Sequence, residues 1–236
     1  MANNDLLYIE DDNKRKLFYR FSPATLISNF VPLIVILDEK SKAEIVHFEH
    51  KMWNVLTPID NFGYKNRGSC WLGEHGDFFV KDLLQKLIHE IAEEYECEDH
   101  IYLYGNSIGG YGAILHGILC KANAVYVNTP YIRLPPKNDA NTEMKSFYDF
   151  IFANTISKEK DLSNFLNSTD TFPVFYLCNN GYYDTSTLKD ETAYFTDTCE
   201  KYDIKIHLDR CVSSEDDENL YLKNVLSFLE RVASEG

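Results

Sequence analysis

Ser107 carries the clearest chemical signature in the sequence. Residues 105–109 read Gly-Asn-Ser-Ile-Gly, and they lie between an apolar run at 101–104 and a helical pattern at 108–119. Glycines two residues before and after the serine permit a tight, strained turn that pushes the hydroxyl clear of the sheet. The backbone N–H of Ile108 lies at the helix N-terminus, where the partial positive charge favours a developing oxyanion. The pattern therefore predicts acyl transfer or acyl hydrolysis, with Ser107 as nucleophile and Ile108 as oxyanion donor.

A serine nucleophile also requires a base to take its proton and an acid to orient that base. In this type of site the three follow in the chain order serine, Asp or Glu, histidine. Asp184 follows a strand predicted at 172–178 and is the candidate for the acid. His207 is the only histidine after Asp184 and is the first candidate for the base, although it lies within a strand predicted at 204–208.

The loop in which the base is expected contains no histidine. This loop covers residues 211–219, between the last predicted strand and the last predicted helix. His75, in the loop before the first long helix, is the alternative base. If neither His75 nor His207 reaches Ser107, the serine is not activated and the site is dead or slow. The other five histidines are interpreted as structural residues of strands, helix faces or turns: 47, 50, 89, 100 and 116.

A loop of small residues at 66–73 supplies candidates for substrate binding. Arg67 would hold a carboxylate, a phosphate or a sugar hydroxyl, and Trp71 could stack on a sugar ring. The alternative interpretation is a surface arginine and a buried anchor tryptophan. His75, which follows this loop, is also a substrate-binding candidate. A different kind of site is also possible from these residues, namely a reactive thiol site formed by Cys70 and His75.

The elements that must position these residues alternate between strands and helices. Strands are predicted at 17–21, 30–37, 44–50, 101–104, 124–128, 172–178 and 204–208, and helices at 77–97, 108–119, 188–202 and 217–232. This alternation predicts a mainly parallel central sheet with helices on both faces, as one domain over residues 1–236. Together with the Gly-Asn-Ser-Ile-Gly turn between strand and helix, it predicts the three-layer α/β-hydrolase fold.

Three local features refine this expectation. Asp77 is the predicted N-cap of the first long helix. The backbone of Asp38 or Glu39, after the strand at 30–37, is expected to supply a second oxyanion donor. Residues 142–166 are either a helical lid over the site or the crossover helices of the sheet.

Composition and charge exclude several classes of protein. The chain has 37 acidic and 23 basic side chains and a net charge of −14, which excludes nonspecific binding to nucleic-acid phosphate. The six cysteines show no zinc spacing, so no metal site is predicted, and no bound cofactor is expected. The longest apolar run, residues 30–37, is too short to span a bilayer. Because the N-terminus lacks an apolar signal region, a cytoplasmic protein with free thiols is expected.

Two segments resemble the α/β-hydrolase proteins of bacterial surface-glycan pathways. They are NRGSCWLG at 66–73, with the helix that follows it, and YGNSIGGYGA at 104–113. The families include capsule polysaccharide O-acetyltransferases and hydrolase-like subunits of accessory secretion systems. In them a serine, aspartate and histidine triad passes an acetyl group from acetyl-coenzyme A to a sugar hydroxyl. The resemblance implies Ser107 as nucleophile, Asp184 as acid, acetyl-coenzyme A as a small-molecule acyl donor and a carbohydrate as acceptor.

The sequence departs from this family pattern at one position. The families place their histidine shortly before the last helix, where this chain has Asp216 and Asp217. An aspartate cannot replace an imidazole as a proton shuttle near neutral pH. The function expected first is an O-acetyltransferase or esterase acting on a bacterial surface carbohydrate. The alternative is a catalytically inactive scaffold or binding subunit in glycan assembly or protein secretion, and both a homodimer and a glycan-assembly complex stay open.

Overall fold

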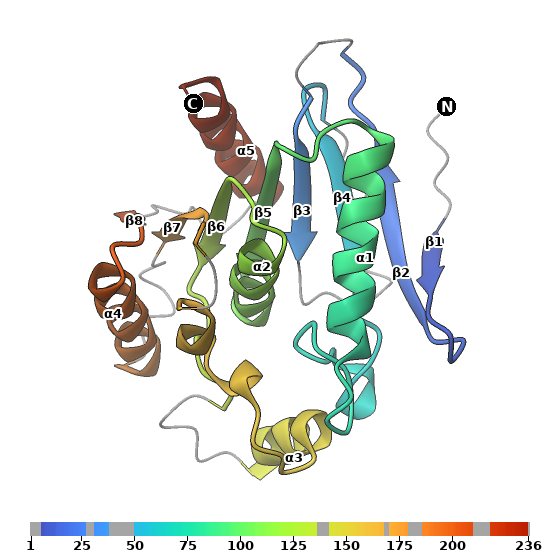
Figure 1. Cartoon of the computed structure of the whole chain (residues 1–236), viewed down its shortest axis with the longest axis vertical. Coiled ribbons are helices and arrows are strands. Elements are labelled where there is room, and N and C mark those ends of the chain that lie inside the picture. The colour runs from blue at the N-terminus through green and yellow to red at the C-terminus, as the bar shows by residue number, and fades with distance from the viewer. Residues whose placement is uncertain are drawn as a thin grey trace.

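The computed structural model describes residues 6–26, 31–37, 50–135, 142–167, 170–178, 186–209 and 218–235. Within these ranges, one eight-stranded sheet runs in the order β1-β2-β4-β3-β5-β6-β7-β8 (Figure 1). The strands are β1 Leu7–Glu10, β2 Lys16–Ser22, β3 Leu33–Leu37, β4 Asn54–Ile59, β5 Ile101–Asn106, β6 Ala124–Asn128, β7 Val174–Cys178 and β8 Ile206–Asp209. The helices are α1 Phe79–Glu94, α2 Ile108–Leu119, α3 Thr142–Phe152, α4 Ser186–Lys201 and α5 Glu218–Glu235, with 3-10 turns η1 Tyr64–Asn66, η2 Lys158–Lys160 and η3 Leu162–Phe165.

The central part of the sheet is parallel, as predicted. Strands β4, β3, β5, β6, β7 and β8 pair in parallel, whereas β1 and β2 pair in antiparallel fashion at one edge. All five residues of β3 (LIVIL) are buried, which explains why its sequence is a continuous apolar run. The four-residue strand β1 was not predicted, because Leu6, Leu7 and Tyr8 are exposed and show no clear alternation.

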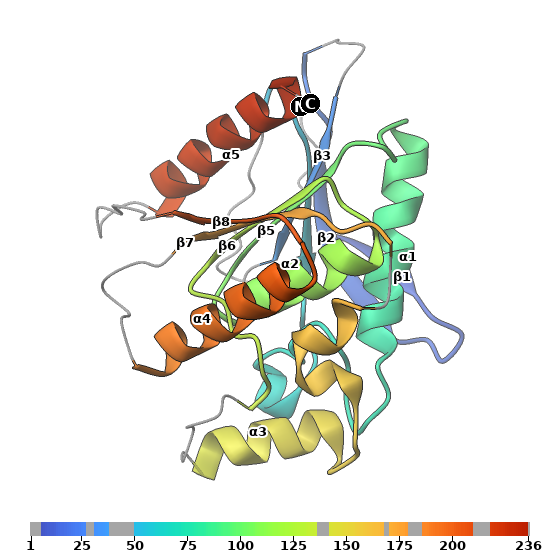
Figure 2. The same ribbon diagram turned by 60° about the vertical axis from the view of Figure 1, so that its left-hand side comes forward.

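Helices cover both faces of the sheet, which confirms the predicted three layers. In Figure 2 the sheet is seen nearly edge-on, with α5 on one side and α1, α2 and α4 on the other. The alternation of side chains along β3 gives the physical basis. Leu33, Val35 and Leu37 join the core beneath α1 and α2, whereas Ile34 and Ile36 join the core beneath α5.

The segment between β6 and β7 leaves the sheet before it returns. Helix α3 lies beyond the carboxyl ends of the parallel strands, beside the loop that leads into α1 (Figures 1 and 2). Two N–H groups of that loop, from His75 and Gly76, donate to the carbonyls of Phe150 and Ile151 at 2.8 Å each. These bonds satisfy two carbonyls at the last turn of α3, which would otherwise lack partners. Helix α3 is therefore docked on a loop at the carboxyl edge of the sheet.

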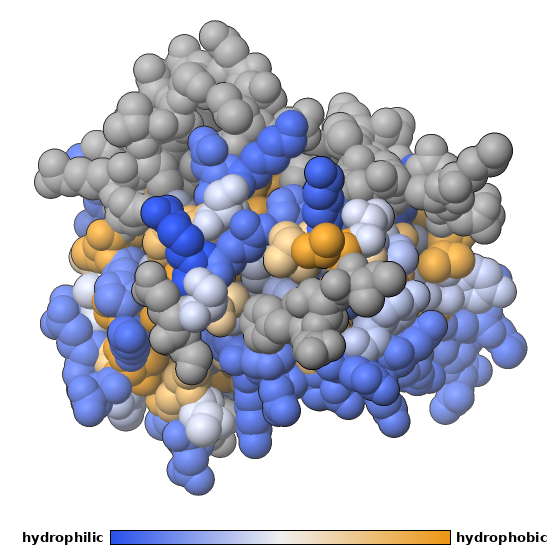
Figure 3. Space-filling model, turned by 90° about the horizontal axis from the view of Figure 1, so that it is seen from above, coloured by the Kyte–Doolittle hydropathy of each residue, from blue (hydrophilic) through white to orange (hydrophobic). Residues whose placement is uncertain are grey.

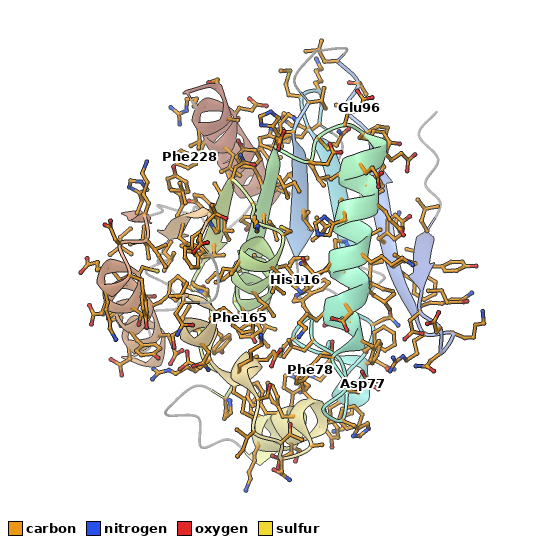
Figure 4. The ribbon with its side chains drawn as sticks, viewed as in Figure 1. Asp77, Phe78, Glu96, His116, Phe165 and Phe228 are labelled. Carbon is orange, nitrogen blue, oxygen red and sulfur yellow. The ribbon has the colours of Figure 1, made fainter. Side chains whose placement is uncertain are left out.

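The start of α1 differs from the prediction. Phe78, not Asp77, occupies the N-cap position, and no side chain caps the helix there. The Asp77 N–H donates to the Glu74 carbonyl at 2.9 Å, which closes a short bridge just before the N-cap residue Phe78. Its carboxylate instead accepts a hydrogen bond from Arg15 Nη1 at 2.6 Å. Figure 4 shows Asp77 and Phe78 together at this end of α1.

The strand predicted at 44–50 lies outside the described residues except for His50, which is not in a strand. The surface seen from above in Figure 3 is largely hydrophilic, with apolar side chains only in small groups among the residues coloured there. No helix in the described ranges has the length and apolar character to cross a bilayer.

Candidate active site

Ser107 occupies a strained turn between β5 and α2. Its backbone has φ 53° and ψ −116°, a region that residues with a β-carbon rarely adopt. Such strain persists only where the surroundings hold it, and it is concentrated at functional sites. The Ser107 N–H donates to the Asn128 carbonyl at 3.0 Å, and the Ser107 carbonyl accepts from the N–H groups of Tyr111 at 3.2 Å and Tyr131 at 3.3 Å. The predicted strand-turn-helix is therefore confirmed.

The glycines around Ser107 are required by close approaches. A β-carbon on Gly105 would lie 2.2 Å from the Gly109 carbonyl oxygen, and one on Gly110 would lie 2.9 Å from the Pro130 side chain. The first approach is to backbone and cannot be relieved by a change of rotamer. The turn therefore depends on the glycine at 105, as the sequence pattern predicts.

The described part of the chain supplies no imidazole to the Ser107 hydroxyl. The hydrogen bonds that the structure shows for Ser107 within the described ranges all involve its backbone. Ile108 is the first residue of α2, so its N–H lies at the positive end of the helix, as predicted. Asp184, Asp216, Asp217, Asp38 and Glu39 lie outside the described residues.

The structure does not bring His207 to Ser107. The strand register places Tyr104, Tyr126, Tyr176 and His207 in one row across β5, β6, β7 and β8. Three strand spacings of about 4.8 Å separate the ends of this row by about 14 Å, and Ser107 lies three residues further along the chain from Tyr104. The exposed His207 ring stacks on Tyr176, with centroids 5.0 Å apart and planes at 13°. The choice of His207 as base is therefore wrong, because chain order carries no information about strand register.

His75 lies on the loop that docks α3. Its side chain is exposed, and its ring packs against Phe150 with centroids 4.2 Å apart. Its N–H donates to the Phe150 carbonyl, and φ 55° marks a tight turn. None of the contacts that the structure shows for His75 among described residues involves Ser107. His75 therefore stays a prediction, located at the carboxyl side of the sheet.

The loop at 66–73 does not present its tryptophan to a substrate. Trp71 is 1% exposed and packs against α2, where a β-carbon on Gly112 would lie 2.2 Å from Trp71 Cδ1. The prediction that Trp71 stacks on a sugar is wrong, and the buried-anchor alternative is correct. Cys70 is also 1% exposed, which excludes the thiol site with His75. Arg67 is exposed, and its Nη1 pairs with Glu143 Oε1 of α3 at 3.0 Å.

A carboxylate that the sequence analysis missed organises this loop. Asp60 directly follows β4, and its oxygens accept from the N–H groups of Ser69 at 2.6 Å and Trp71 at 2.9 Å, and from the Ser69 hydroxyl at 3.0 Å. Burial raises the pKa of Asp60, although these hydrogen bonds favour the ionised form. An acidic residue at the end of a buried strand was the available signal.

A buried histidine supports the same loop from below. His116 of α2 is fully buried and lies between α1 and α2 (Figure 4). Gln85 of α1 donates to its Nδ1 at 2.8 Å, and its Nε2 donates to the Trp71 carbonyl at 3.2 Å. Burial lowers the pKa of His116 to about 4, so the ring is neutral at pH 7. Its interpretation as a structural histidine agrees with these contacts.

An ion pair anchors the segment that follows β6 beside Ser107. Glu191 of α4 is fully buried, and Arg133 donates to Oε1 through Nε at 2.9 Å and Nη2 at 2.5 Å. The N–H groups of Ile132 and Arg133 donate to Oε2 at 3.2 and 2.9 Å. This pairing raises the pKa of Arg133. Since Tyr131 bonds to the Ser107 carbonyl, the pair helps to fix the turn.

The cysteines only partly follow the expectation of free thiols. Cys70, Cys97, Cys120 and Cys199 are buried thiols that form no disulfide, and burial raises the pKa of the Cys97 thiol to about 11. Cys178, the last residue of β7, is disulfide-bonded. The expectation of free thiols is therefore wrong for Cys178, and a structural disulfide is unusual in a reducing cytoplasm. No cluster of three or more potential metal ligands occurs among the described residues.

Comparisons with known proteins identify the fold. The sequence matches no family model and no curated protein. The capsule O-acetyltransferase of Neisseria meningitidis serogroup A is 18% identical, with a TM-score of 0.66 over 96% of this chain and 97% of that chain. FphF, a fluorophosphonate-binding serine hydrolase of Staphylococcus aureus, is 12% identical, with a TM-score of 0.67 over 95% of this chain and 96% of that chain.

One larger protein contains a domain of similar fold. Dipeptidyl peptidase 4 of Porphyromonas gingivalis is 14% identical, with a TM-score of 0.67 over 96% of this chain, but the chain spans only 35% of that protein's length. At identities this low, the structural likeness establishes the α/β-hydrolase fold and not an activity. The predicted fold class is confirmed, as is the predicted structural likeness to capsule O-acetyltransferases.

Proposed function

We propose that this protein carries out serine-dependent acyl transfer or acyl hydrolysis through an acyl-enzyme on Ser107. The observation that carries the proposal is the Ser107 backbone, with φ 53° and ψ −116° at the carboxyl end of a central strand. A serine that only packed would not need a conformation that costs about 1–3 kcal/mol. The surrounding glycines and hydrogen bonds maintain this conformation, which is suited to presenting a hydroxyl.

The chemistry would proceed in two steps. The Ser107 oxygen bonds to the acyl carbonyl carbon while its proton passes to a base, and the carbonyl oxygen becomes an oxyanion near the Ile108 N–H. The leaving group departs with a proton and leaves acyl-Ser107. Water or a sugar hydroxyl then attacks the same carbon and restores the serine. Asp184 is the proposed acid, and His75 is the remaining sequence-predicted candidate for the base.

The acyl donor and the acceptor are proposed by likeness. The N. meningitidis capsule O-acetyltransferase, a protein of nearly the same length, has been observed in complex with CoA. That complex supports acetyl-coenzyme A as donor for this chain, and the name of that protein, a capsule O-acetyltransferase, supports a surface carbohydrate as acceptor. A cytoplasmic location and a homodimer or glycan-assembly complex stay predictions.

A second function is favoured by one specific observation. No histidine in the described ranges contacts the Ser107 hydroxyl, and the sequence just before α5 has Asp216 and Asp217 where a histidine is expected. A serine without a base reacts slowly. The second candidate is therefore an inactive scaffold or binding subunit in glycan assembly or secretion that retains the strained turn.

A burst experiment separates the two functions. The purified protein is mixed with p-nitrophenyl acetate, and p-nitrophenol release is followed alongside labelling by a fluorophosphonate probe. For the enzyme we expect a burst and a label that Ser107→Ala abolishes. His75→Gln should slow acylation by about 10²-fold or more if His75 is the base, whereas the matched change His207→Gln should have no effect. Identical traces for wild type and Ser107→Ala would establish the scaffold.

A further inference from the structure

A second polar side chain lies at the strand end beside Ser107. Asn128 is the last residue of β6, is paired in register with Asn106 of β5, and accepts the Ser107 N–H on its own carbonyl at 3.0 Å. Side chains alternate along a strand, so Asn128 shares a sheet face with Tyr126, whose ring packs against Phe228 of α5. Asn128 therefore lies one strand from the nucleophile turn, at the same carboxyl edge.

The carboxamide of Asn128 is buried without satisfying its oxygen. The residue is 7% exposed, and Oδ1 is fully buried with no hydrogen-bond partner in the part of the chain that the structure describes. Leaving a buried acceptor unpaired is costly, and native proteins leave few such atoms without a reason. Folding alone would favour an apolar side chain of the same size. The amide at 128 is thus better explained by a partner that the free protein does not contain.

The backbone beside Asn128 is strained as well. Thr129 has φ 42° although it is β-branched, so β5 and β6 are each followed directly by a residue with positive φ. The Thr129 N–H donates to the Cys178 carbonyl at 2.8 Å, and its hydroxyl donates to Asn106 Oδ1 at 3.5 Å. Two adjacent strand ends thus hold unfavourable conformations. Strain of this kind clusters where the chain presents groups to a ligand.

The unpaired atom, Asn128 Oδ1, determines which kind of group its partner must carry. A carboxamide oxygen accepts hydrogen bonds, so its partner must carry an O–H or N–H group. In acyl transfer the reacting carbonyl and the ester or thioester sulfur or oxygen offer only acceptors. A sugar acceptor attacks the acyl-enzyme through one hydroxyl, whose proton goes to the base, and its other hydroxyls supply the donors.

We propose that Asn128 binds the acceptor alcohol, with its Oδ1 accepting a hydrogen bond from a hydroxyl of the molecule that attacks acyl-Ser107. This inference rests on the proposed function of Ser107. In the step concerned, the alcohol oxygen bonds to the acyl carbon, the bond from that carbon to Ser107 Oγ breaks, and the alcohol proton is returned to Ser107 through the base. Asn128 takes no proton, and it orients the alcohol. Water, which binds with fewer contacts, would then compete less well.

The test pairs Asn128→Leu with Asn54→Leu, a matched change elsewhere in the sheet. Asn54 is 2% exposed, and its Oδ1 accepts the Ala24 N–H at 3.0 Å, so its amide is satisfied. Thermal unfolding and p-nitrophenyl acetate turnover are measured for both variants and wild type. Turnover is measured with and without methyl α-glucopyranoside, and the acetylated sugar is quantified by mass spectrometry.

We expect the two variants to differ in both measurements. Asn54→Leu should lower the melting temperature, whereas Asn128→Leu should leave it unchanged or raise it, because no hydrogen bond of its side-chain oxygen is lost. In Asn128→Leu the ratio of sugar acetylation to Ser107 acylation should fall about tenfold, as expected for one lost hydrogen bond. Asn54→Leu should keep the wild-type ratio.

Each contrary result has a distinct meaning. A fall in melting temperature for Asn128→Leu equal to that for Asn54→Leu would show that the amide is structural and overturn the inference. An unchanged ratio of transfer to acylation would overturn it while leaving Ser107 as nucleophile. Absence of a Ser107-dependent burst in the wild type would refute the proposed function, and the acceptor role would be refuted with it.

Discussion

Lowering the pH from 7.5 to 5 is expected to destabilise the protein through His116. The ring is buried between α1 and α2, and its pKa is lowered from 6.5 to about 4 in the folded protein. The unfolded chain therefore binds a proton between these values that the folded chain does not bind. The contribution of neutral His116 to the free energy of unfolding is therefore complete well above pH 6.5 and is lost as the pH falls toward 4.

The magnitude follows from the two pKa values. Proton binding to the unfolded chain with a pKa of 6.5, against about 4 in the folded chain, removes about 2 kcal/mol between pH 7.5 and pH 5. This is a large part of the stability of an ordinary domain. The physical cause is desolvation, because the charged ring would be enclosed without water and its Nδ1 would lose the hydrogen bond that it accepts from Gln85.

Urea unfolding measures this loss, with tryptophan fluorescence as the signal. Trp53 and Trp71 are both buried, so unfolding exposes them to water. His116→Gln retains an amide donor for the Trp71 carbonyl and has no proton to bind in this range. The difference in unfolding free energy between wild type and His116→Gln should therefore shift by about 2 kcal/mol between pH 7.5 and pH 5.

A control excludes a general effect of removing a histidine. His89 is exposed on α1, so His89→Gln should follow the wild-type pH dependence. If wild type and His116→Gln lose stability in parallel from pH 7.5 to 5, His116 is not the group responsible and the reasoning from burial is refuted.

Two substitutions test the frame around Ser107. Gly105→Ala would place a β-carbon 2.2 Å from the Gly109 carbonyl oxygen. We therefore expect the free energy of unfolding in urea to fall by about 2 kcal/mol or more, and fluorophosphonate labelling to be slower. Wild-type values in both measurements would show that the turn can relax. Glu191→Ala should cost about 3–5 kcal/mol, because it leaves the donors of Arg133 and its neighbour without their buried acceptor. The matched change Glu143→Ala breaks exposed ion pairs with Arg67 and Lys65 and should cost less than about 1 kcal/mol. Equal losses for the two variants would contradict the ranking by burial.

Local sequence patterns were enough for the elements nearest to the nucleophile. Helix α2 and strand β6 have the predicted bounds, because each is an uninterrupted buried element that ends at a polar or turn residue. The turn at Ser107 was also predictable, since its steric demands involve residues only a few positions apart. The N-cap at Asp77 was not, because a tertiary contact with Arg15 competes for its carboxylate.

Amino-acid types and short-range spacing were sufficient to predict the alternating three-layer fold and the strained serine. Only the folded chain revealed that His207 lies far across the sheet, that Trp71 is enclosed beneath its loop and that Asp60 holds that loop. It also revealed that Asn128 Oδ1, beside the turn, has no partner among the described residues. The reason is that strand register, burial and hydrogen-bond pairing depend on which distant residues meet. A periodic sequence specifies the face on which a side chain lies, but not its neighbours on that face.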